Sequence, residues 1–227
     1  MSAVRQIDRA LKRLYNIETP LCAEKFLVNY FPIGTKKQIA SKDLEGALYI
    51  QQSSVTQESE EPSVDLGIYL SERVRRELKS FPSWQSPWTL EQVKAFSVAS
   101  EEISHFHYLV FNLERNRSVS EFEIELQGEI DKFLLLFFCE SFSGKSGESK
   151  FEELFERLFI NFRLANSLNE IQRQRYLDAS IYAKMFFRKL KRNLAQKRRV
   201  SLALKQTRFF YQMDLAHKMS FLHGTRD

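Results

Sequence analysis

The chain has 227 residues, of which 43% are hydrophobic and 28% are charged, and these proportions exclude a mainly disordered protein. Two cysteines are too few for a disulfide scaffold or a cysteine-based zinc site, and seven glycines with five prolines disfavour a glycine-rich nucleotide-binding fold. The formal net charge of +5 is unevenly distributed: residues 180–227 carry 12 basic and two acidic side chains, whereas the rest of the chain has an acidic excess.

The first part of the chain predicts a helix followed by a β-hairpin. Residues 2–17 favour a helix because Ser2 is a suitable N-cap and apolar side chains recur at spacings of three and four: Val4, Ile7, Leu11 and Leu14. We expect Pro20 to end this helix, and residues 22–31 fit either a helix or a strand. Residues 45–70 predict the hairpin, since two strand candidates with apolar alternation flank a polar, acidic loop.

The chain from residue 88 onward predicts helices. Thr89 can cap the first of them, whose apolar stripe has heptad-like spacing: Phe96, Ala99, Ile103, Phe106, Val110 and Leu113. Ser120 and Glu123 predict a capping box at the start of the second helix. Alternation also fits a strand over residues 122–126, so that alternative stays open.

Three further helices complete the predicted bundle of about five. A short apolar helix is expected near residues 151–162, a long one from Ser167 to about Ala195, and a last one over residues 200–222. The predicted fold class is therefore α+β and mainly α. Residues 1–87 form a small N-terminal element with the hairpin, and residues 88–227 form the helical bundle with basic C-terminal helices.

One set of side chains has the spacing of a carboxylate–histidine metal site. Two acidic residues each precede a histidine by three positions, which places each pair on one side of a helix, and two glutamates lie four positions apart on a helix between them. Helical bundles that hold metal ions use this combination of ligands. The candidate ligands are Glu102, His105, Glu125, Glu129, Asp214 and His217. The alternative is that these charged pairs are ordinary surface features.

The segment 144–146 resembles the second half of a phosphate-binding loop. The position of the first glycine of that motif holds Cys139, whose side chain would obstruct the tight turn around a phosphate. A flexible link is therefore the favoured interpretation. No nucleophile elbow is present, so the sequence predicts no catalytic residue and no cofactor.

The basic C-terminal part predicts a surface that attracts polyanions. The candidate residues are Lys184, Arg188, Lys189, Lys191, Arg192, Lys197, Arg198 and Arg199. Such a density of positive charge attracts phosphate without sequence specificity. Alternatively, the basic helices neutralise acidic helices of the same chain, or a basic amphipathic helix lies on an anionic membrane surface.

The leading functional hypothesis is a cytoplasmic, non-enzymatic interaction or regulatory protein with a protein partner. It rests on the lack of a complete catalytic motif and on the division of charge. The first alternative is binding of nucleic acid or another polyanion by the basic C-terminal helices, and the second is a carboxylate–histidine metalloprotein. The sequence has neither a signal-peptide pattern nor a transmembrane segment, while peripheral membrane contact stays open.

Overall fold

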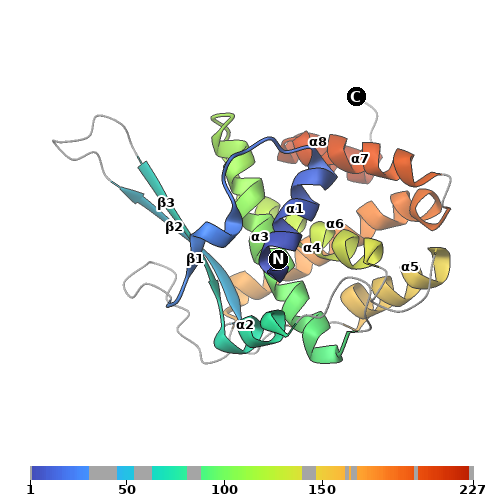
Figure 1. The fold of residues 1–227 in the computed structure, drawn as a ribbon. Helices are drawn as coiled ribbons and strands as arrows, with labels where there is room; N and C mark the ends of the chain where they lie inside the picture. The colour runs from blue at the N-terminus through green and yellow to red at the C-terminus, as the bar shows by residue number, and fades with distance from the viewer. Residues whose placement is uncertain are drawn as a thin grey trace.

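The computed structural model describes residues 2–30, 45–53, 63–80, 88–139, 147–161, 164, 168–196 and 199–224. Within these ranges, eight α-helices and one three-stranded sheet form an α+β fold that is mainly helical, as the sequence predicts. The sheet lies at one side of the helical body (Figure 1). No helix of the described ranges is both long and apolar enough to span a bilayer.

Helix α1 (Ala3–Tyr15) has the predicted N-cap and the predicted buried face. The side-chain oxygen of Ser2 accepts a hydrogen bond from the backbone N–H of Arg5 at 3.2 Å. The helix ends at Asn16, whose φ of 53° is left-handed, so it stops before Pro20 and not because of it. The ambiguous segment that follows forms a 3₁₀ turn, η1 (Ala23–Phe26), and a two-residue strand, β1 (Leu27–Val28).

The predicted hairpin is confirmed. Strand β2 (Gly46–Ser53) pairs antiparallel with β3 (Ser63–Leu70), and β1 adds to the other edge of β3 in parallel, which gives the order β1-β3-β2. Helix α2 (Glu72–Lys79) follows directly. The hydroxyl of Ser71 caps it by accepting a hydrogen bond from the N–H of Val74.

The two central helices begin at the predicted caps, and the capping box predicted for Ser120 and Glu123 is confirmed. Helix α3 (Leu90–Leu113) has the box of Thr89 and Gln92, and helix α4 (Glu121–Phe138) has the box of Ser120 and Glu123. The strand alternative for residues 122–126 is wrong, because the capped segment continues as a helix whose face at helical spacing is buried. α3 and α4 pack against each other along their length.

The next two helices along the chain differ from the prediction in their bounds. Helix α5 (Gly147–Phe155) runs into a π-helical turn, η3 (Glu156–Ile160), and helix α6 (Glu170–Ala195) begins at a capping box of Asn169 and Gln172, not at Ser167.

The prediction of a single last helix is wrong. It is two helices, α7 (Val200–Gln212) and α8 (Leu215–His223), because Asp214 leaves the helical conformation and caps α8. Among the described residues from 88 onward there are therefore six α-helices, not five.

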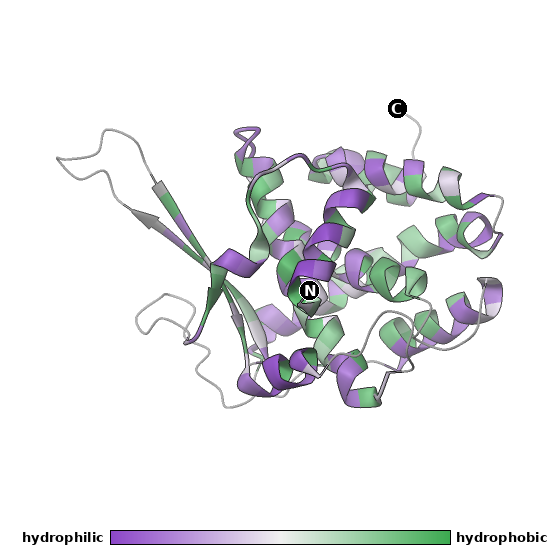
Figure 2. Ribbon diagram, viewed as in Figure 1, coloured by the Kyte–Doolittle hydropathy of each residue, from purple (hydrophilic) through white to green (hydrophobic). Residues whose placement is uncertain are grey.

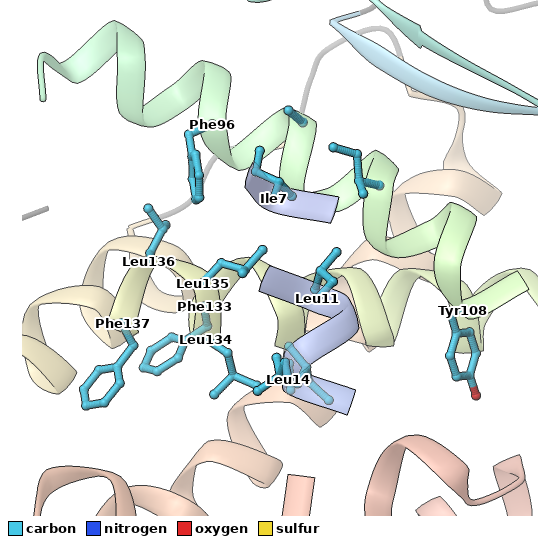
Figure 3. Packing of buried hydrophobic residues seen from close by; sticks show 14 of the residues in the cluster. Ile7, Leu11, Leu14, Phe96, Tyr108, Phe133, Leu134, Leu135, Leu136 and Phe137 are labelled. Atoms are coloured by element: carbon cyan, nitrogen blue, oxygen red, sulfur yellow. The ribbon is translucent and has the colours of Figure 1, made fainter. Parts of the chain in front are cut away.

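One hydrophobic core joins the hairpin, α1 and the bundle. Figure 3 shows Ile7, Leu11 and Leu14 of α1 in one cluster with Phe96 of α3 and Phe133 and Leu134 of α4. Phe133 of α4 is at the centre of an aromatic group with the rings of Phe137, Phe151, Phe159 and Phe187. Hydrophilic and hydrophobic residues alternate along the helices, the pattern of amphipathic helices around a shared core (Figure 2).

Candidate metal centre between two central helices

A buried group of ionisable side chains lies where α3, α4 and α6 meet. We call it the acidic cluster, and it consists of Glu101, Glu102, His105, Glu125, Glu129, Lys132 and Arg175. Each of these side chains is less than a fifth exposed. Helical spacing on α3 and on α4 turns the acidic side chains toward the neighbouring helix, and packing of the two helices then brings them together.

His105 is the centre of the acidic cluster. The residue is 5% exposed, its Nδ1 lies 3.5 Å from Oε2 of Glu102, and its Nε2 lies 3.5 Å from Oε2 of Glu125. Nε2 makes no hydrogen bond within the described residues. The two ring nitrogens therefore face carboxylates of different helices. In a metal-binding histidine, a carboxylate on one ring nitrogen fixes the ring orientation while the other nitrogen binds the ion, and Glu102 on Nδ1 has the first of these positions.

Gly128 of α4 makes room for this ring. A Cβ atom at residue 128 would lie 2.6 Å from Nε2 of His105 and 3.2 Å from Cγ of Glu101, so any other residue would displace the imidazole. Gly128 therefore allows α4 to pack closely against the histidine. A glycine inside a helix costs about 1 kcal/mol relative to alanine. The room that the His105 ring needs accounts for this unfavourable residue inside α4.

Lys132 connects the two sides of the acidic cluster. Its Nζ lies 3.0 Å from Glu101 and 2.7 Å from Glu129. Burial disfavours the ammonium ion, but the two carboxylates outweigh burial and raise the pKa of Lys132 above its usual range. Burial would also raise the pKa of Glu101, but Lys132 and His105 hold that pKa below its usual value. Arg175 of α6 pairs with Glu121, and its Nε lies 3.6 Å from Glu125.

The acidic cluster has an excess of negative charge. Its four carboxylates face two permanent cations, Lys132 and Arg175, which leaves two negative charges when His105 is neutral. Although burial alone would lower the pKa of His105, Glu102, Glu125 and Glu101 raise it to about 9. Burial raises the pKa of Glu129. Protons on His105 and Glu129 can therefore balance the charge, and a divalent cation that displaces the proton of His105 can balance it as well.

Three candidate ligand atoms, one each from Glu101, His105 and Glu125, lie within 4.8 Å of one another. The 3.5 Å separation of the His105 and Glu125 atoms is close to the distance between two ligands of a tetrahedral ion with bonds of about 2.1 Å. Glu102 contacts the opposite nitrogen and positions the ring. Glu129 binds Lys132 and lies beside the three-ligand group. Glu101, which also pairs with Lys132 at 3.0 Å, provides the third atom of the group.

Asp214 and His217 lie outside the acidic cluster, which corrects their place among the candidate ligands. Oδ1 of Asp214 accepts a hydrogen bond from the backbone N–H of His217 at 2.9 Å and contacts its Nδ1 at 2.6 Å. Both side chains are exposed. Their three-residue spacing is that of a helix N-cap and its third residue, and this capping explains the pair without a metal.

Three residues of the acidic cluster were missed from the sequence. Glu101 stands four positions before His105, the same helical face as the predicted pair, so its spacing was a usable signal. Lys132 stands three positions after Glu129, and this spacing also indicated an ion pair. Arg175 comes from a distant helix, and only the packing of α6 against α4 reveals it.

The basic residues of α6 divide into paired and unpaired ones. Lys191 pairs with Glu148 and Glu152 of α5, and Lys189 lies over the ring of Phe221. Within the described ranges, no acidic side chain pairs with Lys184, Arg188, Arg192 or Arg199. Lys197, Arg198 and the segment 144–146 lie outside the described residues.

Cations that precede the basic C-terminal part neutralise four glutamates of the acidic helix α4. Arg175 pairs with Glu121 and Glu125, Arg117 with Glu123, and Lys132 with Glu129, and all three cations precede residue 180. The positive face of α6 is thus not required to balance α4. No protein-family model, curated protein or solved structure matches this chain, so the geometry of these sites is what bears on its function.

Proposed function

We propose that the chain binds one divalent transition-metal ion through Glu101, His105 and Glu125. The observation that carries the proposal is Nε2 of His105, which is buried, makes no hydrogen bond within the described residues and lies 3.5 Å from Glu125. A ligand set of one imidazole and two carboxylates suits Mn²⁺, Fe²⁺ or Zn²⁺. Bound there, the ion cancels two buried negative charges and links α3 to α4.

Metal binding at this site is coupled to the stability of the fold, because the unfolded chain lacks the assembled ligands. Such coupling suits the non-enzymatic interaction or regulatory role that the sequence predicts, and that role stays a prediction. The two free cysteines agree with the proposed cytoplasmic location, where thiols remain reduced.

The first test is the metal content and metal-dependent stability of the full chain. Protein stripped with a chelator and titrated with Mn²⁺, Fe²⁺ or Zn²⁺ is expected to bind one equivalent in calorimetry. At a hundredfold excess over Kd, the ion should add about 2.7 kcal/mol to the free energy of unfolding. For a chain of this size, that raises Tm by about 5–10 °C.

Matched histidine variants locate the ion. His105→Gln and Glu125→Gln are expected to remove the bound equivalent, whereas His217→Gln, which alters the exposed histidine with the same acidic spacing, should leave it unchanged. A folded wild-type chain that takes up none of the three metals contradicts the proposal, as does equal loss of metal in His217→Gln.

Gly128→Ala is a second probe that changes no ligand. Alanine favours the helix by about 1 kcal/mol, but its Cβ would lie 2.6 Å from Nε2 of His105 and push the ring away. We expect a folded protein whose metal affinity is at least tenfold lower, measured by calorimetry. Unchanged affinity in this variant would show that the ion lies elsewhere.

A second candidate function rests on the positive face of α6. Lys184, Arg188 and Arg192 recur every four residues, so they form one stripe, and no acidic side chain of the described ranges pairs with them. We propose that this stripe binds a nucleic-acid backbone without sequence specificity.

A salt series with labelled mixed-sequence RNA tests this second function by fluorescence anisotropy. Binding should weaken linearly in log salt, and Arg192→Gln should reduce the slope by about one. Lys191→Gln is the matched control, because Glu148 and Glu152 already neutralise that lysine. Equal slopes for the two variants, or no binding at low salt, would refute the stripe as the site.

A further inference from the structure

A cavity of about 580 Å³ opens between α1, the end of α4 and α7, away from the acidic cluster. Its volume is within the roughly 300–1,000 Å³ typical of small-molecule sites. Its wall includes Gln6 and Ala10, and its larger apolar side chains are Leu14, Leu135, Leu204 and Phe138. Phe138 is 41% exposed although it is a large apolar residue. The cavity therefore offers an apolar surface that no described side chain fully covers.

Three arginines complete the wall: Arg9 and Arg13, four residues apart on α1, and Arg208 on α7. No aspartate or glutamate is among the residues that line the cavity. Within the described ranges, the Arg13 side chain forms no ion pair or hydrogen bond. Positive charge is thus concentrated at one apolar cavity, and within the described ranges Arg13 and Arg208 form no ion pair.

Arg208 is held in place by the end of α1. Its Nε donates a hydrogen bond to the carbonyl oxygen of Leu14 at 2.7 Å, and one terminal nitrogen donates to the carbonyl of Arg13 at 3.3 Å. These bonds satisfy carbonyls at the C-terminus of the helix and fix the plane of the guanidinium. The charge of Arg208 is not cancelled by them. A fixed guanidinium loses less entropy on binding an anion than a freely rotating one.

We propose that this cavity binds a single-chain anionic amphiphile, with its alkyl chain against the leucines and Phe138 and its phosphate or carboxylate head on the arginines. The chemistry of the wall carries both halves of the proposal. Guanidinium groups bind oxyanions with two parallel hydrogen bonds, which ammonium groups cannot do, and all cations of this wall are arginines. A wholly polar anion would gain nothing from the four apolar side chains, and an uncharged lipid would gain nothing from the arginines.

The test is calorimetric titration of the full chain with dodecyl phosphate below its micelle concentration. Octyl phosphate should bind about two-hundredfold more weakly, since it buries four fewer methylenes. Arg13→Gln should weaken dodecyl phosphate binding about tenfold. Arg5→Gln is the matched control, because Arg5 is exposed on the same helix but does not line the cavity, and its affinity should change less than twofold.

Inorganic phosphate and dodecyl maltoside separate the two halves of the proposal. Inorganic phosphate has no alkyl chain and dodecyl maltoside has no charge, so each should bind far more weakly than dodecyl phosphate. Equal affinity for inorganic phosphate would reduce the cavity to a simple anion site and overturn the proposal. A dimer in sedimentation that Leu204→Gln converts to a monomer would also overturn it, because a second copy of the chain would then fill the cavity.

Discussion

Lys132→Met is expected to destabilise the protein by about 3–5 kcal/mol, the usual cost of removing one partner of a buried ion pair. Lys132 lies between Glu101 and Glu129, with Nζ at 3.0 and 2.7 Å. Methionine preserves the length and apolar stem of the side chain, so packing changes little. The loss arises because two buried carboxylates keep their desolvation cost without the ammonium ion. Urea unfolding monitored by circular dichroism measures it.

Lys94→Met is the control for this experiment. Lys94 forms an ion pair with Glu91 at 2.7 Å on the same helix as Glu101, but the side chains of Lys94 and Glu91 are both about half exposed. Exposed pairs contribute about 0–1 kcal/mol, so this variant should unfold almost like the wild type. Adding Glu129→Gln to Lys132→Met should restore part of the lost stability. Equal effects of the two lysine substitutions would show that the acidic cluster is not desolvated.

Lys218→Met is expected to act in the opposite direction and to stabilise the protein at pH 6 by at most about 5 kcal/mol, the free-energy equivalent of lowering the lysine pKa from 10.5 to about 7. Lys218 of α8 is 0% exposed. Its Nζ donates a hydrogen bond to the hydroxyl of Tyr108 at 2.7 Å and lies over the rings of Tyr108 and Phe210. Burial lowers the pKa of Lys218 to about 7, despite Glu123, Asp131 and Asp214, which favour the charged form against Arg117. A neutral side chain of similar length removes this desolvation cost.

The stability gain should depend on pH. Between pH 7 and about 10.5, the unfolded chain holds a proton on Lys218 that the folded chain has released, so the stability of the wild type rises with pH. The difference from Lys218→Met should therefore narrow above pH 7, by at most about 1.4 kcal/mol per pH unit. Lys205→Met, at an exposed position of α7, should leave the pH profile unchanged. A difference in the free energy of unfolding between Lys218→Met and the wild type that stays constant from pH 6 to 9.5 would contradict the prediction.

The helix starts of this fold were predictable because they are local. Ser2, Ser71, Thr89 and Ser120 each accept a hydrogen bond from an N–H three residues later, and short sequence patterns report such bonds. Asp214 has the same role, but apolar residues at helical spacing on both sides of it favoured one continuous helix. Asn169 with Gln172 also forms a capping box that competed with Ser167 in the sequence.

The candidate site was predictable only within each helix. The spacing of Glu102 and His105 placed both on one side of α3, and the spacing of Glu125 and Glu129 did the same for α4. The meeting of His105 with Glu125 depends on how α3 and α4 slide past each other when they pack, and side-chain volumes such as the missing Cβ of Gly128 decide that register. A sequence pattern along one helix does not specify this register between two helices.

The hydrogen bond from Arg208 to the carbonyl of Leu14 spans 194 residues of chain, and this distance affects the synthesis of the protein. At about 5–20 residues per second, α1 waits roughly 10–40 s after its own translation before α7 is made. During this time α3 and α4 can already cover the apolar face of α1, but the carbonyls of Arg13 and Leu14 have no Arg208 to bind. We therefore expect the C-terminal end of α1 to be the last part of that helix to become protected from hydrogen exchange during synthesis.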